Sequence, residues 1–351
     1  VKADNGHELA FLERVLRTFA YKAEAPLMFG ETRNIIMITG FLPKKSRATV
    51  YQKLNKVTQH GIYVEWLKLQ DKEEIPVKIE NPPFVKPYEF LIRMFSMPKY
   101  REIDPTLFMF FTFPLFFGFM LGDIGYGIVT LFLFLFLKKK MPKAAPLLNI
   151  MIFSSLSTIV FGFIFGEFFG FELGHVHFIE ELAHDWHIHY PFVHRGASTV
   201  MQLINYSLIM GLIHVNLGLL LGFYNIWKDH GLMHAVLEKG SWFMLEVSVV
   251  LIAGTYMHLL PLQKWVGWSV LALAVYMLFK GEGIQGLVEI PSIFVHVGSY
   301  LRLMAIGMAS VGLAVVINEQ SVPLFQQGLA WGILGVVIFA IGHIINIALG
   351  I

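Results

Sequence analysis

The sequence predicts an all-α polytopic membrane domain of about eight membrane helices, preceded by a partial α+β cytoplasmic domain. The first observation is composition: 56% of the 351 residues are hydrophobic and only 15% are charged, which is typical of an integral membrane protein with a soluble part. The second is that long apolar segments recur from residue 105 to residue 351, whereas ordinary polar sequence is concentrated in residues 1–100. The third is a single ionised side chain, Arg302, inside an apolar stretch from Ile290 to Asn318.

Residues 1–100 read as the end of an N-terminal cytoplasmic domain and its linker. A small β-α-β piece is expected, in which Pro43 begins the second helix and Gly61 follows its end. The Pro-rich stretch 75–87 predicts an extended linker into the membrane. The chain opens within a charged helical pattern and stops within an apolar run, so we expect a fragment of a longer protein. The predicted elements are a helix over 8–19, a strand over 34–40, a helix over 43–60 and a strand over 62–69.

The C-terminal transmembrane domain is expected over 101–351. The first apolar segment is either one tilted span or two short arms that fold back at Gly122–Gly127. The positive-inside rule favours the hairpin, because most lysines after it then fall on the side of the N-terminal domain. Both termini are therefore expected in the cytoplasm, and the short arms are expected to be partly buried against other helices. The apolar segments are 105–137, 146–170, 198–227, 240–260, 262–280, 285–318 and 322–351.

Arg302 is the strongest functional candidate. A guanidinium near the middle of a span costs roughly 2.5–3.5 kcal/mol on insertion scales, and arginine stays charged at physiological pH. Its distance from both ends of the segment argues against snorkelling to the headgroups. At 100° per residue it shares a face with small residues that would let another helix approach, so this face is expected to dock a partner carboxylate. The small residues are Gly298, Ser299, Ala305, Ala309 and Gly312.

Glu289 and His296 share a different face of the arginine helix and would suit a proton-access path, so with Ser299 they are expected to take part in ion translocation beside Arg302. The other polar residues in the spans are weaker candidates for a channel or for packing. The last segment carries His343 and Asn346 beside a stripe of glycines, which is more often a packing feature. His214 lies in the segment 198–227, and Glu167 lies in the sequence FGEFFG near an exit end. Asp123 stands at the predicted hairpin turn, where it would cap the second arm.

The outward loop 171–197 is rich in histidine and acidic residues. A zinc site in its HDWHIH sequence is one reading, but the spacing matches no closed-site pattern, and a solvated, pH-sensitive loop is the preferred one. No metal and no cofactor are therefore expected. The chain has no cysteines and a net charge near zero, which excludes thiolate sites and argues against a nucleic-acid partner. It has no GxxxxGK[ST], HExxH or GxSxG sequence, so nothing here hydrolyses ATP by itself.

Several longer motifs resemble the large membrane stator subunit of rotary ATPases, which is called subunit a in vacuolar enzymes and subunit I in archaeal ones. The resemblance covers nearly the whole chain and is closer to the archaeal and bacterial branch. It rests on SYLRLMAIGMA (299–309), YREIDPT (100–106), FPLFFGFMLGDIGYG (113–127), FGEFFG (165–170), HVNLGLLLGFYN (214–225), EKGSW (238–242) and GHIINIALG (342–350).

The resemblance implies a mechanism and partners. The two long tilted helices, here 285–318 and 322–351, would face a ring of proteolipid subunits, each carrying a membrane carboxylate. Arg302 would hold that carboxylate ionised as it passes, between two offset half-channels for protons or sodium ions, and Glu289 would match a glutamate of the cytoplasmic access path. The N-terminal domain would bind peripheral stalks, in the cell membrane of an archaeon or bacterium. The family's second arginine would fall in a motif beyond Ile351, so the exit half-channel is expected to be incomplete.

An autonomous secondary transporter is an alternative from a different class of function. In an autonomous secondary transporter, Arg302 would bind an anionic substrate between helices of this chain. An inverted internal repeat would favour that class, and the sequence shows none. A membrane-anchored metal-binding protein that uses the histidine-rich loop is a third reading.

Overall fold

The computed structural model describes residues 2–24, 29–68, 75–175 and 190–351, with side chains described from residue 11 onward. The chain divides into two compact units, Val1–Pro76 and Val77–Ile351. Each unit is considered by itself.

Among its described residues, unit 1 has two α-helices, a short 3-10 turn and a hairpin of two two-residue strands. The expected helix over 43–60 is confirmed as a short 3-10 turn followed by α2, and the expected strand over 34–40 appears as β2, paired antiparallel with β1. The expected strand over 62–69 is wrong for residues 61–68, which are irregular. A strand requires a neighbouring strand for its backbone hydrogen bonds, and β2 takes β1 instead. The elements are α1 (Lys2–Glu24), β1 (Gly30–Glu31), β2 (Ile36–Met37), η2 (Lys44–Ser46) and α2 (Arg47–Val57).

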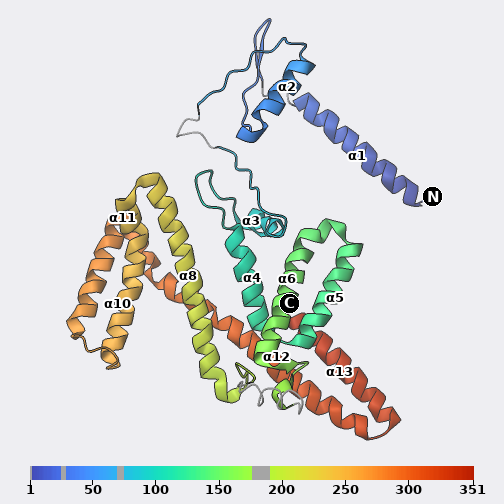
Figure 1. Ribbon diagram of the computed structural model, residues 1–351, viewed down its shortest axis with the longest axis vertical. Helices are drawn as coiled ribbons and strands as arrows, with labels where there is room; N and C mark the ends of the chain where they lie inside the picture. The colour runs from blue at the N-terminus through green and yellow to red at the C-terminus, as the bar shows by residue number, and fades with distance from the viewer. Residues whose placement is uncertain (1, 25–28, 69–74, 176–189) are drawn as a thin grey trace. The chain divides into compact units, whose positions relative to one another are not determined.

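Unit 2 is a bundle of helices (Figure 1). Its main helices are α3 (Glu89–Phe95), α4 (Thr106–Leu121), α5 (Ile124–Lys140), α6 (Ala145–Phe165), α8 (Val200–His230), α9 (Leu232–Ala235), α10 (Ser241–Tyr256), α11 (Lys264–Ser299), α12 (Leu301–Ser321) and α13 (Leu329–Gly350). The shorter elements are η3 (Lys86–Tyr88), η4 (Pro142–Ala144), β3 (Glu167–Phe168), β4 (Phe171–Glu172), η5 (Leu173–His175), η6 (Ala197–Thr199), η7 (Val236–Gly240) and η8 (Val322–Gln326).

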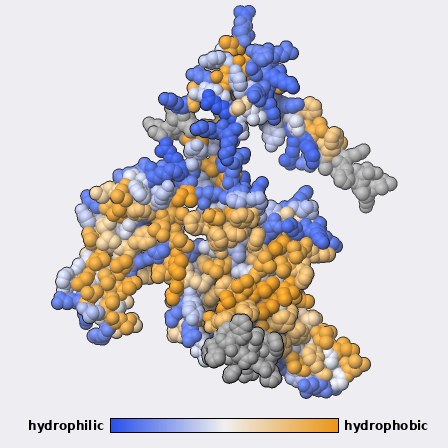
Figure 2. Space-filling model, viewed as in Figure 1, coloured by the Kyte–Doolittle hydropathy of each residue, from blue (hydrophilic) through white to orange (hydrophobic). Residues whose placement is uncertain are grey.

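The surface of unit 2 is that of a membrane protein. Within the described residues, four helical segments are long and apolar enough to cross a bilayer: Pro142–Phe165, Val200–His230, Lys264–Gln326 and Leu329–Gly350. Figure 2 shows apolar side chains over much of the visible face of this unit, and large apolar residues such as Trp265, Ile284 and Val288 are exposed. Contiguous apolar surface of this kind is paired with lipid or with another protein.

The segment expected as a hairpin breaks where the sequence predicts. α4 ends at Leu121, Gly122 and Asp123 leave the helical conformation, and α5 begins at Ile124. Both arms pack against α6. The arms are therefore partly buried, as expected, against α6.

One glycine makes this corner possible. A Cβ on Gly162 of α6 would lie 2.3 Å from the backbone nitrogen of Ile124 and 2.6 Å from the carbonyl carbon of Asp123. Only a residue without a side chain lets α6 approach the backbone of the corner so closely. The corner and α6 are thus fixed against each other by backbone contact.

Replacing Gly162 by alanine should therefore destabilise the protein, because neither backbone can move without disturbing the corner. We expect a loss of about 1–3 kcal/mol, as for other overpacked sites, measured as a lower thermal unfolding midpoint of the detergent-solubilised full-length subunit. Gly218→Ala in α8, where the added carbon meets open space, is the matched control. Equal midpoints for the two variants would contradict this account.

The arginine segment differs from the expectation of one helix over 285–318. α11 begins much earlier, at Lys264, and kinks at Gly283, which has φ 70° and ψ −150°. It ends at Ser299, and α12 begins at Leu301. Around the break, Tyr300 N bonds to Val297 O and Leu303 N bonds to Tyr300 O, so the turn tightens to three-residue hydrogen bonds.

The last expected segment is confirmed as α13, which packs against α12 (Figure 1). The expected start at residue 322 belongs instead to the short 3-10 segment η8. Gly328, with φ 107°, then supplies a conformation that suits glycine before α13 begins. Ala314 and Ile317 of α12 and Ile347 of α13 are buried.

Candidate functional site: an open arginine face on α12

The two faces of α12 differ in burial. One face is buried: Gly307, Ser310, Ala314, Ile317, Asn318 and Ser321. The other face is exposed at intervals of three or four residues, at Arg302, Ala305, Ala309 and Gly312. Residues so spaced lie together on one side of a helix. Arg302 therefore lies on a strip of small residues that remains exposed in the described part of the chain.

Within the described part of the chain, the Arg302 guanidinium makes no ion pair and no side-chain hydrogen bond. A bare guanidinium in an apolar region is costly, and it cannot lose its proton to avoid that cost. An anionic group from outside this chain would pair with it. The docking face for a partner carboxylate stays a prediction.

Glu289, His296 and Ser299 lie on α11, on the other side of the break from Arg302. All three are exposed. The Gln285 amide nitrogen donates to a Glu289 carboxylate oxygen at 3.1 Å, and the Ser299 hydroxyl donates to the His296 carbonyl at 2.6 Å. Tyr300, between Ser299 and Arg302, keeps helical φ and ψ of −70° and −17°, so exposed Ser299 continues the strip of small residues into the last turn of α11.

His214 of α8 is brought against the break itself. Its Nδ1 is hydrogen-bonded to the Tyr300 hydroxyl, and the Phe116 ring lies 4.9 Å from the imidazole. Gly211, one turn away, lies beside the Tyr300 ring, which a Cβ would meet at 2.7 Å. His214 and Gly211 of α8 therefore anchor the residue that immediately precedes α12.

Glu167 lies in a buried ion pair rather than on an open path. Arg195 Nε donates to its Oε1 at 3.0 Å, and a second guanidinium nitrogen bonds its other oxygen. The same guanidinium donates to the carbonyls of Met120 and Gly122 at the end of α4. Both side chains are buried, and burial raises the pKa of Glu167 while Arg195 opposes that shift.

Asp123 caps α5 as expected, and it does more. Its carboxylate accepts the backbone N–H of Tyr126 at 3.0 Å, of Phe169 at 2.9 Å and of Gly170 at 2.9 Å. The last two residues lie in the turn between β3 and β4. The carboxylate thus satisfies backbone donors from both the corner and this turn.

His343 and Asn346 are buried between α13 and its neighbours. The Tyr126 hydroxyl and His343 Nδ1 lie 2.7 Å apart, and His343 Nε2 lies 3.1 Å from Asn318 Oδ1. The Asn346 amide donates to the Tyr126 hydroxyl and to the Ser310 carbonyl, each at 2.8 Å. These contacts join α5, α12 and α13.

Arg195, Tyr126, Asn318 and Tyr300 have roles in the structure that were not predicted from the sequence. Arg195 did carry a signal, because it was one of few cations on the outward side of the predicted topology. The other three are ordinary residues of apolar segments, and their partners lie far away in the sequence. The histidine-rich stretch 176–189, including HDWHIH, falls outside the described residues, so the zinc reading is not tested.

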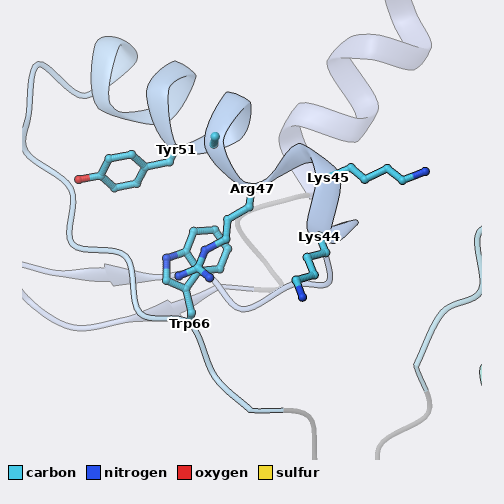
Figure 3. Close-up of a pocket in the computed structure, with 6 residues that line it drawn as sticks. Lys44, Lys45, Arg47, Tyr51 and Trp66 are labelled. Atoms are coloured by element: carbon cyan, nitrogen blue, oxygen red, sulfur yellow. The ribbon is translucent and has the colours of Figure 1, made fainter.

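Unit 1 carries a separate shallow hollow of about 380 Å³. Figure 3 shows Lys44 and Arg47 at its rim, with the Arg47 guanidinium 4.2 Å from the Trp66 ring centre. Lys45, Ala48 and Tyr51 complete the lining. Its cations would attract anionic groups.

The fold and the site together define a polytopic helical membrane protein with an open arginine on one of its long C-terminal helices. Residues 20–179 match the model of the V-type ATPase 116 kDa subunit family. The chain belongs to this family.

Curated relatives agree with this assignment. A-type ATP synthase subunit I of Archaeoglobus fulgidus is 33% identical, over 98% of this chain and 58% of the relative. The protein of the same name from Methanothermobacter thermautotrophicus is 30% identical, over 99% and 51%. V-type ATP synthase subunit I 2 of Treponema pallidum is 27% identical, over 62% and 54%. The chain spans about half the length of the curated relatives it matches.

Proposed function

We propose that the chain is part of the stator subunit of a rotary A/V-type ATPase or ATP synthase, and that it couples movement of protons or sodium ions to rotation. The open arginine face of α12 carries this proposal. A ring of proteolipid subunits, each with a membrane carboxylate, would move past Arg302, Ala305, Ala309 and Gly312. The small residues would let the ring helices approach the α12 backbone closely.

The electrostatics support the proposal. A carboxylate that faces lipid is costly when ionised, so it is neutral except beside a cation. Arg302 is a fixed cation without a partner among the described side chains, so it can pair transiently with each carboxylate in turn. One charge crossing 100 mV carries about 2.3 kcal/mol, which is too little to make one ATP. A ring would sum several such steps.

The remaining candidates are assigned around this face. Glu289, His296 and Ser299, exposed on α11, would serve the cytoplasmic access path. His214, next to the break, and Glu167 and Asp123, at the α4–α5 corner, would shape the route on the other side. His343 and Asn346 of α13 lie against Asn318 and Ser310, on the buried face of α12.

The partners and the setting follow from the family. The N-terminal domain would bind the peripheral stalks, and the membrane would be the cell membrane of an archaeon or bacterium. Lys138, Lys139 and Lys140 end α5, which fits a cytoplasmic loop under the positive-inside rule. Both termini would then be cytoplasmic. A secondary transporter is not favoured, because the relatives are ATP synthase subunits and the Arg302 face is open.

A cysteine crosslinking experiment tests the ring contact. Ala309→Cys would be made in a cysteine-free full-length subunit, assembled in its complex and labelled with a photoreactive maleimide. Ala309 is exposed on the arginine face, so we expect a crosslink to a proteolipid subunit. Ala314→Cys is the matched control, because Ala314 is 1% exposed on the opposite face. If the two positions gave equal yields, or Ala309 crosslinked only to lipid, the proposed ring contact would be rejected.

A further inference from the structure

Buried polar residues on the side of α12 opposite Arg302 form a series of hydrogen bonds. The donors and acceptors in this series determine which atoms carry a hydrogen. The Asn318 amide nitrogen donates to the Phe169 carbonyl at 2.8 Å. The Asn318 oxygen is therefore the atom that faces His343 Nε2, and an amide oxygen only accepts. Nε2 of His343 must then carry a hydrogen.

The hydrogen bonds on the Tyr126 side of His343 require the same protonation state of the imidazole. The Asn346 amide nitrogen donates to the Tyr126 hydroxyl oxygen and to the Ser310 carbonyl. The Tyr126 hydroxyl is then free to donate its own hydrogen to His343 Nδ1. Every polar atom on this route is satisfied when His343 is neutral with its hydrogen on Nε2.

A second proton on His343 would break this arrangement. Nδ1 would become a donor toward Tyr126, and the tyrosine hydrogen would lose its acceptor. Tyr126, His343 and Asn346 are at most 3% exposed, and an unpaired buried donor is costly. The carboxylate of Asp123, which caps the helix of Tyr126, already accepts three backbone N–H groups. The site is built to hold a neutral imidazole rather than to pass protons.

These hydrogen bonds also join helices that could otherwise move past one another. Tyr126 belongs to α5, Asn318 to α12 and His343 to α13, while Phe169 lies in the turn that Asp123 fixes to the α4–α5 corner. Gly170 in that turn approaches α12 so closely that a Cβ would lie 2.4 Å from the Ala314 Cβ. The pair α12–α13 is therefore fastened to the rest of unit 2 on the face opposite Arg302.

We propose that Tyr126, His343, Asn318 and Asn346 form a non-titrating latch that holds the α12–α13 pair in position against the sideways force of the moving ring. This inference rests on the proposed function, and it makes these four residues positioning residues. If these hydrogen bonds were lost, Arg302 would be displaced as the ring passes. ATP hydrolysis would then continue while fewer ions are moved per ATP.

The test uses the full-length subunit in its reconstituted complex. We would measure ions transported per ATP hydrolysed, passive ion leak and assembly for His343→Leu, His343→Gln and Tyr126→Phe. Leucine removes both hydrogen bonds, whereas glutamine cannot titrate and keeps one donor and one acceptor. We expect ions per ATP to fall severalfold in His343→Leu and Tyr126→Phe, with leak increased, and to be largely restored in His343→Gln. Tyr276→Phe, at an exposed tyrosine of α11, should match the wild type.

Each other outcome overturns the latch. Equal loss of transport in His343→Gln and His343→Leu would mean that the imidazole moves protons. Normal ions per ATP in His343→Leu and Tyr126→Phe would mean that no restraint is needed. Failure of Tyr126→Phe to assemble, with Tyr276→Phe assembled, would make the hydroxyl a folding requirement only. Arg302→Ala measured in parallel separates the two ideas, because normal pumping there would remove the proposed function itself.

Discussion

Replacing Arg302 by alanine should abolish ion transport while leaving the complex assembled. The side chain is exposed and makes no described contact within this chain, so its loss removes little from the fold. The passing carboxylate, however, loses the cation that stabilises its ionised form. If that stabilisation is about 3 kcal/mol, transport should fall roughly 100-fold, since each 1.4 kcal/mol is a factor of ten. The measurement is ATP-driven acidification, or sodium uptake, in vesicles that contain the reconstituted complex.

Two controls accompany this measurement. Arg302→Lys keeps the charge but loses the planar fork of the guanidinium, so it should keep part of the transport. Lys143→Ala removes an exposed cation between α5 and α6 and should have no effect. If Arg302→Ala pumped at the wild-type rate in an assembled complex, the arginine would be structural and the proposed function would fall.

Replacing Arg195 by methionine should strongly destabilise the protein, an effect second only to that of replacing Arg302. The guanidinium holds Glu167 and two carbonyls at the end of α4, all in a buried place. Removing one partner of a buried ion pair typically costs 3–5 kcal/mol. Burial raises the pKa of Glu167 and Arg195 opposes that shift, so losing Arg195 should raise it further, and the carbonyls of Met120 and Gly122 would lose their donor.

The measurement is the yield of assembled complex together with the thermal unfolding midpoint of the solubilised subunit. Both should drop in Arg195→Met. The double variant Arg195→Met, Glu167→Leu should recover part of the loss, because an apolar pair of similar volume can replace a buried ion pair. An unchanged midpoint in the single variant would show that water reaches this pair and that it is not a structural element.

The sequence predicts the parts of this fold that depend on local chemistry. The break between α4 and α5 follows from glycines around Asp123, whose side chain can accept the orphan N–H groups of a helix start. α13 follows from a long apolar stretch after Gly328. The division of α11 from α12 was not predictable in this way, because Tyr300 is no helix breaker and the turn is tightened around a side chain anchored by His214 of another helix.

The same distinction applies to the candidate site. Arg302 stands out by itself, since a lone charge in an apolar segment needs no partner to be noticed. The latch could not be predicted, because Tyr126 and His343 are separated by 217 positions and helical periodicity assigns a residue to a face without naming the opposing residue. The expected strand over 62–69 failed for a related reason: alternation of side chains indicates an extended chain, but only a neighbouring strand makes it a strand.

The lengths of α4 and α5 have a consequence for the membrane itself. At 1.5 Å per residue, helices of 16 and 17 residues rise only about 24 and 26 Å, less than the roughly 30 Å of hydrocarbon in a bilayer. In the proposed topology, lipid beside these arms would thin to match them, or headgroups and water would descend toward the corner at Gly122. In either case the transmembrane voltage would fall over a shorter distance there, so the electric field on an ion would be steeper beside this corner than across the surrounding bilayer.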